Sequence, residues 1–110
     1  MDYRMKDGQM RRVHREEVDV LARFGRDGRL EPCIVVLRDC RAFRIDEVMG
    51  STGFGQPHHG RRTACYDVRL GGRETRLYLE HRLEDPATGM PDRYVWWAYV
   101  NDGMKTKPGC

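Results

Sequence analysis

The stretch ACYDVRLGGRETRLYL, residues 64–79, decides the fold of this chain because it sets its own strand register. Gly71 and Gly72 form a two-residue hairpin loop without steric cost, since glycine adopts positive φ freely. The loop then aligns two alternating strands. One face carries Tyr66, Val68, Leu70, Thr75, Leu77 and Leu79, and the other brings together two pairs of opposite charge, Arg69 with Glu74 and Asp67 with Arg76. The stretch therefore predicts an antiparallel hairpin with one apolar and one charged face.

Alternating segments continue upstream of this hairpin. In residues 17–24 an apolar face alternates with Asp19, Leu21 and Arg23, and the turn GRDGR at 25–29 leads into an apolar segment at 30–37. Folding back at this turn places Phe24 opposite Leu30 and Val20 opposite Ile34. Pro32 cannot donate a hydrogen bond to a neighbouring strand, so we expect its nitrogen to point away from the partner strand or a bulge to form there.

Two further strands complete the pattern. A tight turn at Asp39 and Cys40 leads into residues 41–48 and places Val36 opposite Phe43. Cys40 is unfavourable at positive φ, so a longer or bulged turn is an alternative. The last segment, RYVWWAYV at 93–100, is apolar on both faces, as is typical of a central or doubly covered strand.

Six strands, short turns and no helical pattern predict an all-β fold. We expect a six-stranded antiparallel meander curled into a small barrel or half-barrel. The chain of 110 residues is long enough for one domain, which we place at 17–100, between a flexible basic N-terminal arm at 1–16 and a polar tail at 101–110. No apolar run approaches the roughly 18–20 residues that span a bilayer, and the N-terminus lacks a signal-peptide core, which favours a cytoplasmic protein with no membrane partner.

The cysteines and histidines do not predict a metal or cofactor site. The four cysteines, Cys33, Cys40, Cys65 and Cys110, contain no CxxC pair, and without an export signal we expect free thiols. His58 and His59 are adjacent, so their rings point apart in extended backbone, and no HxxxH spacing occurs. A composite site with Cys65 and His81 would form only by coincidence of the fold.

Catalytic patterns are equally weak, so we expect a protein that is not an enzyme. Ser51 is the only serine and has no GxSxG context. The carboxylate pairs at 46–47 and 84–85 are adjacent in sequence, so their side chains face opposite ways on a strand. A small enzyme or a metal-binding protein is the third alternative.

The glycine-rich segment MGSTGFGQPHHGRR, residues 49–62, is the leading candidate for a contact surface, because long irregular loops are often functional. Its candidate contact residues are Phe54, His58, His59, Arg61 and Arg62. Nucleic-acid binding is the second hypothesis and would combine these arginines with aromatic platforms at Phe54, Tyr78, Trp96 or Trp97, and Tyr99. The charge distribution opposes it, since the strand-bearing regions sum to −3 while the two ends and this loop sum to +6.

The segment CRAFRIDEV, residues 40–48, followed by a hairpin and a tryptophan-rich last strand, resembles a family of small bacterial all-β domains with no assigned function. In those domains a Gly-Arg-x-Tyr-x-Val-like strand follows an apolar one, and here Cys40 stands in place of the glycine. The resemblance covers residues 30–100 and implies no activity. Our leading hypothesis is a non-enzymatic interaction module that binds a protein partner, or forms a homodimer, through a sheet edge, the 49–62 loop, or the second apolar face of Val35, Leu37 and Trp97.

Overall fold

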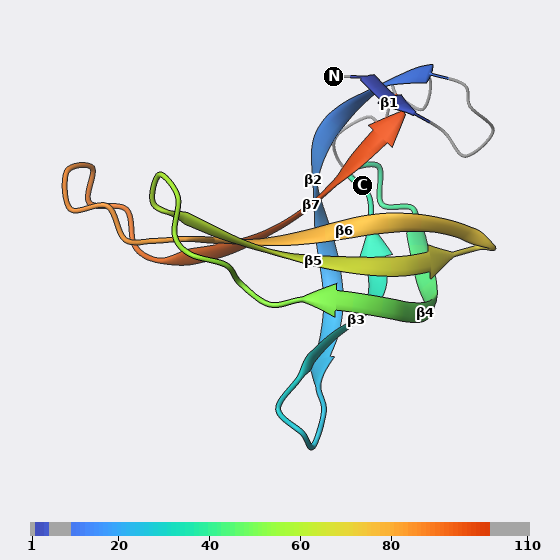
Figure 1. The fold of residues 1–110 in the computed structure, drawn as a ribbon, viewed down its shortest axis with the longest axis horizontal. Coiled ribbons are helices and arrows are strands. Elements are labelled where there is room, and N and C mark those ends of the chain that lie inside the picture. Colours follow the sequence, from blue (N-terminus) through green and yellow to red (C-terminus); the bar gives the residue numbers. More distant parts are fainter. Residues whose placement is uncertain (1, 5–9, 102–110) are drawn as a thin grey trace.

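The computed structural model describes residues 2–4 and 10–101, which form seven strands and no helix. The strands are β1 (Asp2–Arg4), β2 (Met10–Phe24), β3 (Leu30–Val36), β4 (Ala42–Thr52), β5 (Arg61–Leu70), β6 (Arg73–Arg82) and β7 (Arg93–Asn101). They follow one another in a single sheet, in which β7 also pairs with β2 (Figure 1). Strands β2 to β7 therefore close into a small six-stranded antiparallel barrel, which confirms the predicted fold class.

The long strand β2 makes the closure possible by pairing with different strands along its length. Its residues 10–12 pair with β1, residues 13–18 with β7, and residues 19–24 with β3. Its C-terminal part leaves the barrel as one arm of the β2–β3 hairpin, which projects at the bottom of Figure 1. The domain boundary expected between residues 16 and 17 therefore falls inside β2. The expected arm is strand from Met10 onward, and most of the expected tail lies outside the described residues.

The hairpin of β5 and β6 has the predicted register at every position, from Leu70 opposite Arg73 to Arg61 opposite Arg82. Gly71 and Gly72 both have positive φ, at 54° and 81°. The predicted charge pairs are present as well: Arg76 Nε lies 3.2 Å from Asp67 Oδ1, and Arg69 Nη2 lies 3.7 Å from Glu74 Oε1. The glycine loop is thus sufficient to align these strands.

The predicted pairing of β2 with β3 is correct near the turn and wrong beyond it. Phe24 faces Leu30 and Ala22 faces Pro32, but Val20 faces Val35 rather than Ile34. A β-bulge causes the difference, because one residue of β3 is left without an opposite residue between Pro32 and Ile34. Pro32 therefore lies next to a bulge, as its missing N–H allows.

The pairing of β3 with β4 also differs from the prediction by one residue. Val36 faces Ala42 and Val35 faces Phe43, because the loop contains three residues rather than two. Backbone hydrogen bonds from Leu37 N to Arg41 O and from Cys40 N to Leu37 O, both 2.9 Å, close it. Cys40 has a φ of 69°, so the longer turn places this cysteine in the left-handed region after all.

The barrel interior contains a cluster of Val18, Val35, Ile45, Val68 and Leu77, with Trp96 and Tyr66 packed against it. The shifted register turns Val35 into the core and places Leu37 against it. Trp97 is only 7 % exposed although it lies on the outer side of the sheet. Of the expected second apolar face, Val35 and Trp97 are therefore buried, and only Leu37 is partly exposed.

The expected 14-residue loop at 49–62 is largely strand. β4 extends to Thr52 through two bulges, β5 begins at Arg61, and only residues 53–60 connect them. The glycines of this segment, beginning with Gly50, led to the prediction of a loop, because glycine is depleted in regular strands. Glycine is nevertheless common at β-bulges, and β4 contains two of them. The described part of the chain contains no helix that could span a bilayer.

Candidate interaction surface

The main candidate for an interaction surface is the side of β2 that no strand covers. Beyond Val18, which faces Trp96, β7 no longer pairs with β2. Residues 19–24 of β2 then pair with β3 on one side only, and residues 93–95 of β7 pair with β6 on one side only. Within the described chain, two strand edges therefore diverge and leave their backbone groups open. We call residues 19–24 of β2 the free edge.

A groove of about 460 Å³ lies where the two strands diverge. Its lining comprises Val18, Val20, Val36, Leu37, Tyr94, Val95 and Trp96 together with the charged Glu17, Asp19 and Arg38, and most of its accessible surface is polar. An extended segment that pairs with the free edge would therefore also contact the polar and apolar groups of this groove.

Exposed apolar side chains occur on the free edge and in the lining of the groove. Phe24 is 76 % exposed, and Leu21 and Tyr94 are each 60 % exposed, which makes them the three most exposed large hydrophobic residues of the described chain. Leu21 and Phe24 belong to the free edge, and Tyr94 lines the groove. Exposed apolar side chains on an open strand edge are typical of a contact surface.

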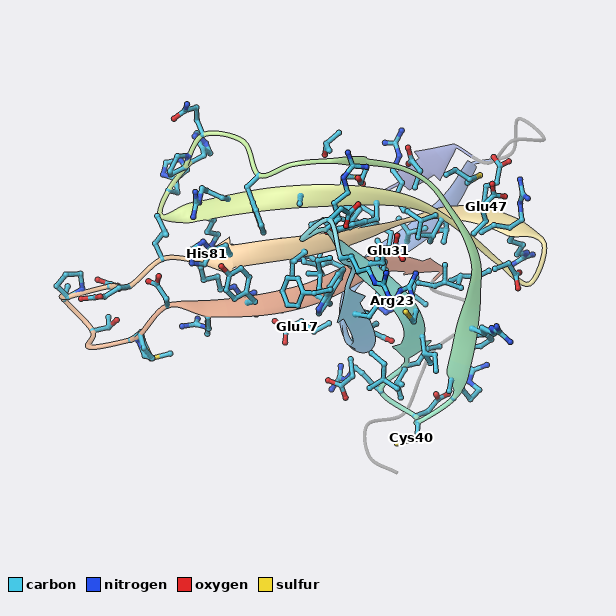
Figure 2. All side chains as sticks on the ribbon, turned by 90° about the horizontal axis from the view of Figure 1, so that it is seen from below. Glu17, Arg23, Glu31, Cys40, Glu47 and His81 are labelled. Carbon is cyan, nitrogen blue, oxygen red and sulfur yellow. The ribbon has the colours of Figure 1, made fainter. Side chains whose placement is uncertain are left out.

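Charged groups frame the free edge. Arg23 donates from Nε and Nη2 to Glu31 Oε2, at 3.1 Å and 2.9 Å, across the β2–β3 hairpin (Figure 2). The Arg23 side chain is exposed, and the hydrogen bond and the charge of Glu31 raise its pKa. Asp19, at the other end of the free edge, is exposed, and no ion pair to it occurs within the described residues.

A second cluster surrounds His81 on the inner side of β6. Its Nδ1 accepts a hydrogen bond of 2.8 Å from Arg62 Nη2, because a guanidinium can only donate. Nε2 then carries the proton and donates to Asp92 Oδ2 at 3.2 Å. The ring stacks on Tyr94 at 4.4 Å and meets the edge of Phe54 at 6.2 Å. Both ring nitrogens are occupied, so His81 presents no free base to a substrate.

A third cluster centres on Glu80, which is 2 % exposed on the outer side of the same strand. Its carboxylate accepts hydrogen bonds from Arg15 and from Arg82 Nε, the latter at 2.7 Å, and Arg61 lies 3.7 Å away. Burial raises the pKa of Glu80, but the hydrogen bonds and charges of Arg82 and Arg15 outweigh it and hold the pKa below its ordinary value of 4.5. The cluster neutralises a buried carboxylate and is structural in character.

Arg15 also covers Trp97. Its guanidinium carbon lies 3.9 Å from the centroid of the Trp97 ring. Tyr78, on the neighbouring strand β6, stacks on the same ring with the two centroids 4.1 Å apart. The indole is thus enclosed and offers no face on which a base could stack. Trp96 packs inside the barrel against Tyr66. Neither tryptophan serves as the open platform that nucleic-acid binding would use.

The five predicted contact residues do not form one surface. Phe54 and Arg62 come together beside His81, whereas Arg61 points to the other side of β5 and faces Glu80. His58 and His59 belong to a tight turn in which His58 and Arg61 exchange backbone hydrogen bonds of 2.8 Å and 3.1 Å. A sheet edge was among the expected contact sites, but none of the five predicted contact residues belongs to the free edge. The one sequence signal for it is Leu21, an apolar residue on the face of Asp19 and Arg23.

Metal and thiol chemistry have little support in the described residues. No group of three or more His, Cys, Asp or Glu side chains there is arranged to hold a metal ion. Cys33 and Cys65 are free thiols, as expected, and burial raises the pKa of Cys65, which makes it a weaker nucleophile. Cys40 is disulfide-bonded, so the expectation of free thiols is wrong for this residue.

Comparisons with known proteins add no functional assignment. No protein-family model matches the chain, and neither the curated proteins nor the solved structures contain a significant match. The free edge, the groove and the two polar clusters are the features of the structure that bear on function.

Proposed function

We propose that the chain is a non-enzymatic interaction module that binds an extended polypeptide segment at the free edge of β2. The observation that carries this proposal is the coincidence of an uncovered strand edge, a groove beside it, and the exposed side chains of Leu21 and Phe24 on the edge itself. An added strand would pair its backbone with residues 19–24 and place alternate side chains into the groove.

The polar clusters favour binding over catalysis. The nitrogens of His81 are held by Arg62 and Asp92, and the carboxylate of Glu80 is surrounded by arginines. A catalytic base or nucleophile needs an unoccupied lone pair within reach of a substrate. Neither cluster offers one.

Nucleic-acid binding is the weaker alternative because several arginines of the sheet have carboxylate partners. Arg15, Arg69, Arg76 and Arg82 each contact an acidic side chain, and Trp97 is covered. Retention on heparin or single-stranded DNA at low salt, lost in an Arg61→Ala, Arg62→Ala variant, would favour this alternative over the proposal.

Selection from a random peptide library displayed on phage tests the proposal. We expect peptides that bind the wild-type chain in the micromolar range and bind a Leu21→Asp variant at least tenfold more weakly. Glu47→Lys, an exposed charge change on β4 away from the free edge, is the matched control and should bind normally (Figure 2). Peptides that bind both variants equally, or a library without binders, would refute the proposal.

A further inference from the structure

We propose that the extended segment is the free edge of a second copy of this chain, paired antiparallel to the first about a two-fold axis at Leu21. This inference rests on the proposed function and names its partner. It follows from the order of residues along the free edge, Asp19, Val20, Leu21, Ala22 and Arg23, which is complementary to its own reverse.

Symmetry restricts the possible registers. A two-fold axis normal to the sheet keeps the outer face of both copies on the same side, so a residue of β2 can face only residues of its own parity. The axis must therefore pass through a residue rather than between two residues. Within the free edge, the candidates for the central position are Val20, Leu21 and Ala22.

Only the register centred on Leu21 is complementary. It places Leu21 against Leu21, Val20 against Ala22, and Asp19 against Arg23, with each unlike pair occurring twice by symmetry. A centre at Ala22 would place Leu21 against Arg23. A centre at Val20 would place Asp19 against Leu21 and would leave only residues 19–21 free to pair, because β7 occupies the open side of residues 13–18.

The same register accounts for the exposed aromatic residue at the end of the hairpin. Position 24 of one copy lies level with position 18 of the other, whose open side pairs with Trp96 of β7, so the strand pairing ends at position 23, where the groove begins. Phe24, 76 % exposed in the single chain, would then lie at the groove beside Val18 and Tyr94 of the second copy. Leu21 would lose its exposure at the axis.

The charges fit this pairing. Asp19 is exposed and forms no ion pair within the described chain, while Arg23 extends from the hairpin with its guanidinium on Glu31. Two carboxylates on either side of one guanidinium form a stable arrangement, because arginine has five donors. Opposite charges directly across an antiparallel pair stabilise it, and like charges destabilise it.

Charge exchange between two variants tests the register. The wild-type chain should sediment as a dimer, whereas Asp19→Arg and Arg23→Asp should each dimerise about tenfold more weakly, since each brings two pairs of like charges together. Mixing the two variants should restore a dimer of one copy of each, observed by native mass spectrometry. Circular dichroism of each variant checks that the barrel is intact, which is expected because both positions are exposed.

Crosslinking provides a measurement that does not depend on these charges. Leu21→Cys places two thiols directly across the axis, at a separation that permits a disulfide, so oxidation should give a covalent dimer. Asp27→Cys, at the tip of the hairpin, is the control and should remain monomeric on denaturing gels. A monomeric wild type, or variants that dimerise like the wild type and do not recover on mixing, would overturn the inference. Such a result would refute the dimer but not the binding of peptides at the free edge. The proposed peptide binding is refuted only if the phage selection also gives a negative result.

Discussion

Replacement of Glu80 by glutamine should lower the free energy of unfolding by about 2 kcal/mol. The side chain of Glu80 is only 3 % exposed and accepts hydrogen bonds from Arg15 and Arg82, whose side chains are 39 % and 20 % exposed. A hydrogen bond to a charged group contributes roughly 1.5–3 kcal/mol when both partners are buried. The hydrogen bond from Arg15 contributes much less free energy than this, because the Arg15 guanidinium is partly exposed to solvent. Glutamine keeps the shape but leaves three arginines around a neutral group.

Urea unfolding followed by tryptophan fluorescence measures this loss, since Trp97 lies directly beside Arg15. The matched control is Glu74→Gln on the same strand and the same face, where the contact to Arg69 is long and exposed. We expect a change below about 0.5 kcal/mol for this control. A loss below that value for Glu80→Gln would show that the arginines do not stabilise the fold through this carboxylate.

The difference between wild type and Glu80→Gln should also depend on pH. Because folding lowers the pKa of Glu80 from its ordinary value of 4.5, the ionised group stabilises the folded state fully above that pH. The stabilisation is lost as pH falls from 4.5 through the lower pKa of the folded state. The two unfolding curves should therefore converge in acid, and a constant difference down to low pH would contradict the assigned cause.

Three other substitutions test the packing. Leu77→Ala should cost about 3 kcal/mol in urea unfolding, because it opens a cavity at a fully buried position of the core. Gly72→Ala should cost about 1 kcal/mol in the same assay, entirely through backbone strain, since φ is 81° and no atom lies within 4 Å of the added methyl group. Arg15→Ala in a Trp96→Phe background should shift the fluorescence of Trp97 to longer wavelength and increase its quenching by acrylamide, because the guanidinium covers the indole.

Local sequence was sufficient for the fold class and for one complete hairpin. Gly71 and Gly72 both take positive φ, so the loop length and the register follow from two residues. The turn at 25–29 was equally readable, with Gly28 at a φ of 79°. Where glycine marks the left-handed position, the sequence predicts the pairing of the adjacent strands.

The bulges were not predictable from alternation. Residues 33–37 are apolar on both faces, so a shift by one residue exchanges one apolar face for another without a visible conflict. The bulge beside Pro32 turned Val35 into the core in this way. The two bulges of β4 likewise made strand out of a segment that its glycines marked as loop.

The free edge was not predictable because it depends on where two distant strands stop pairing. β7 leaves β2 at Trp96, and nothing in residues 19–24 encodes that point. The His81 cluster has the same origin, since Phe54, Arg62 and Tyr94 come from three separate segments. Leu21 is the single local sign of the free edge, and its exposure depends on the point at which β7 leaves β2.

An open strand edge exposes a protein to pairing with any extended chain, and the charges on this edge restrict that choice. Asp19 and Arg23 flank three apolar residues at a spacing of four. An uncharged strand would leave both charges beside apolar groups, and a strand with the charges in the opposite order would repel them. An antiparallel copy of the same segment satisfies both charges at once. The residues that protect the edge against unrelated partners are therefore the same residues that would select a second copy.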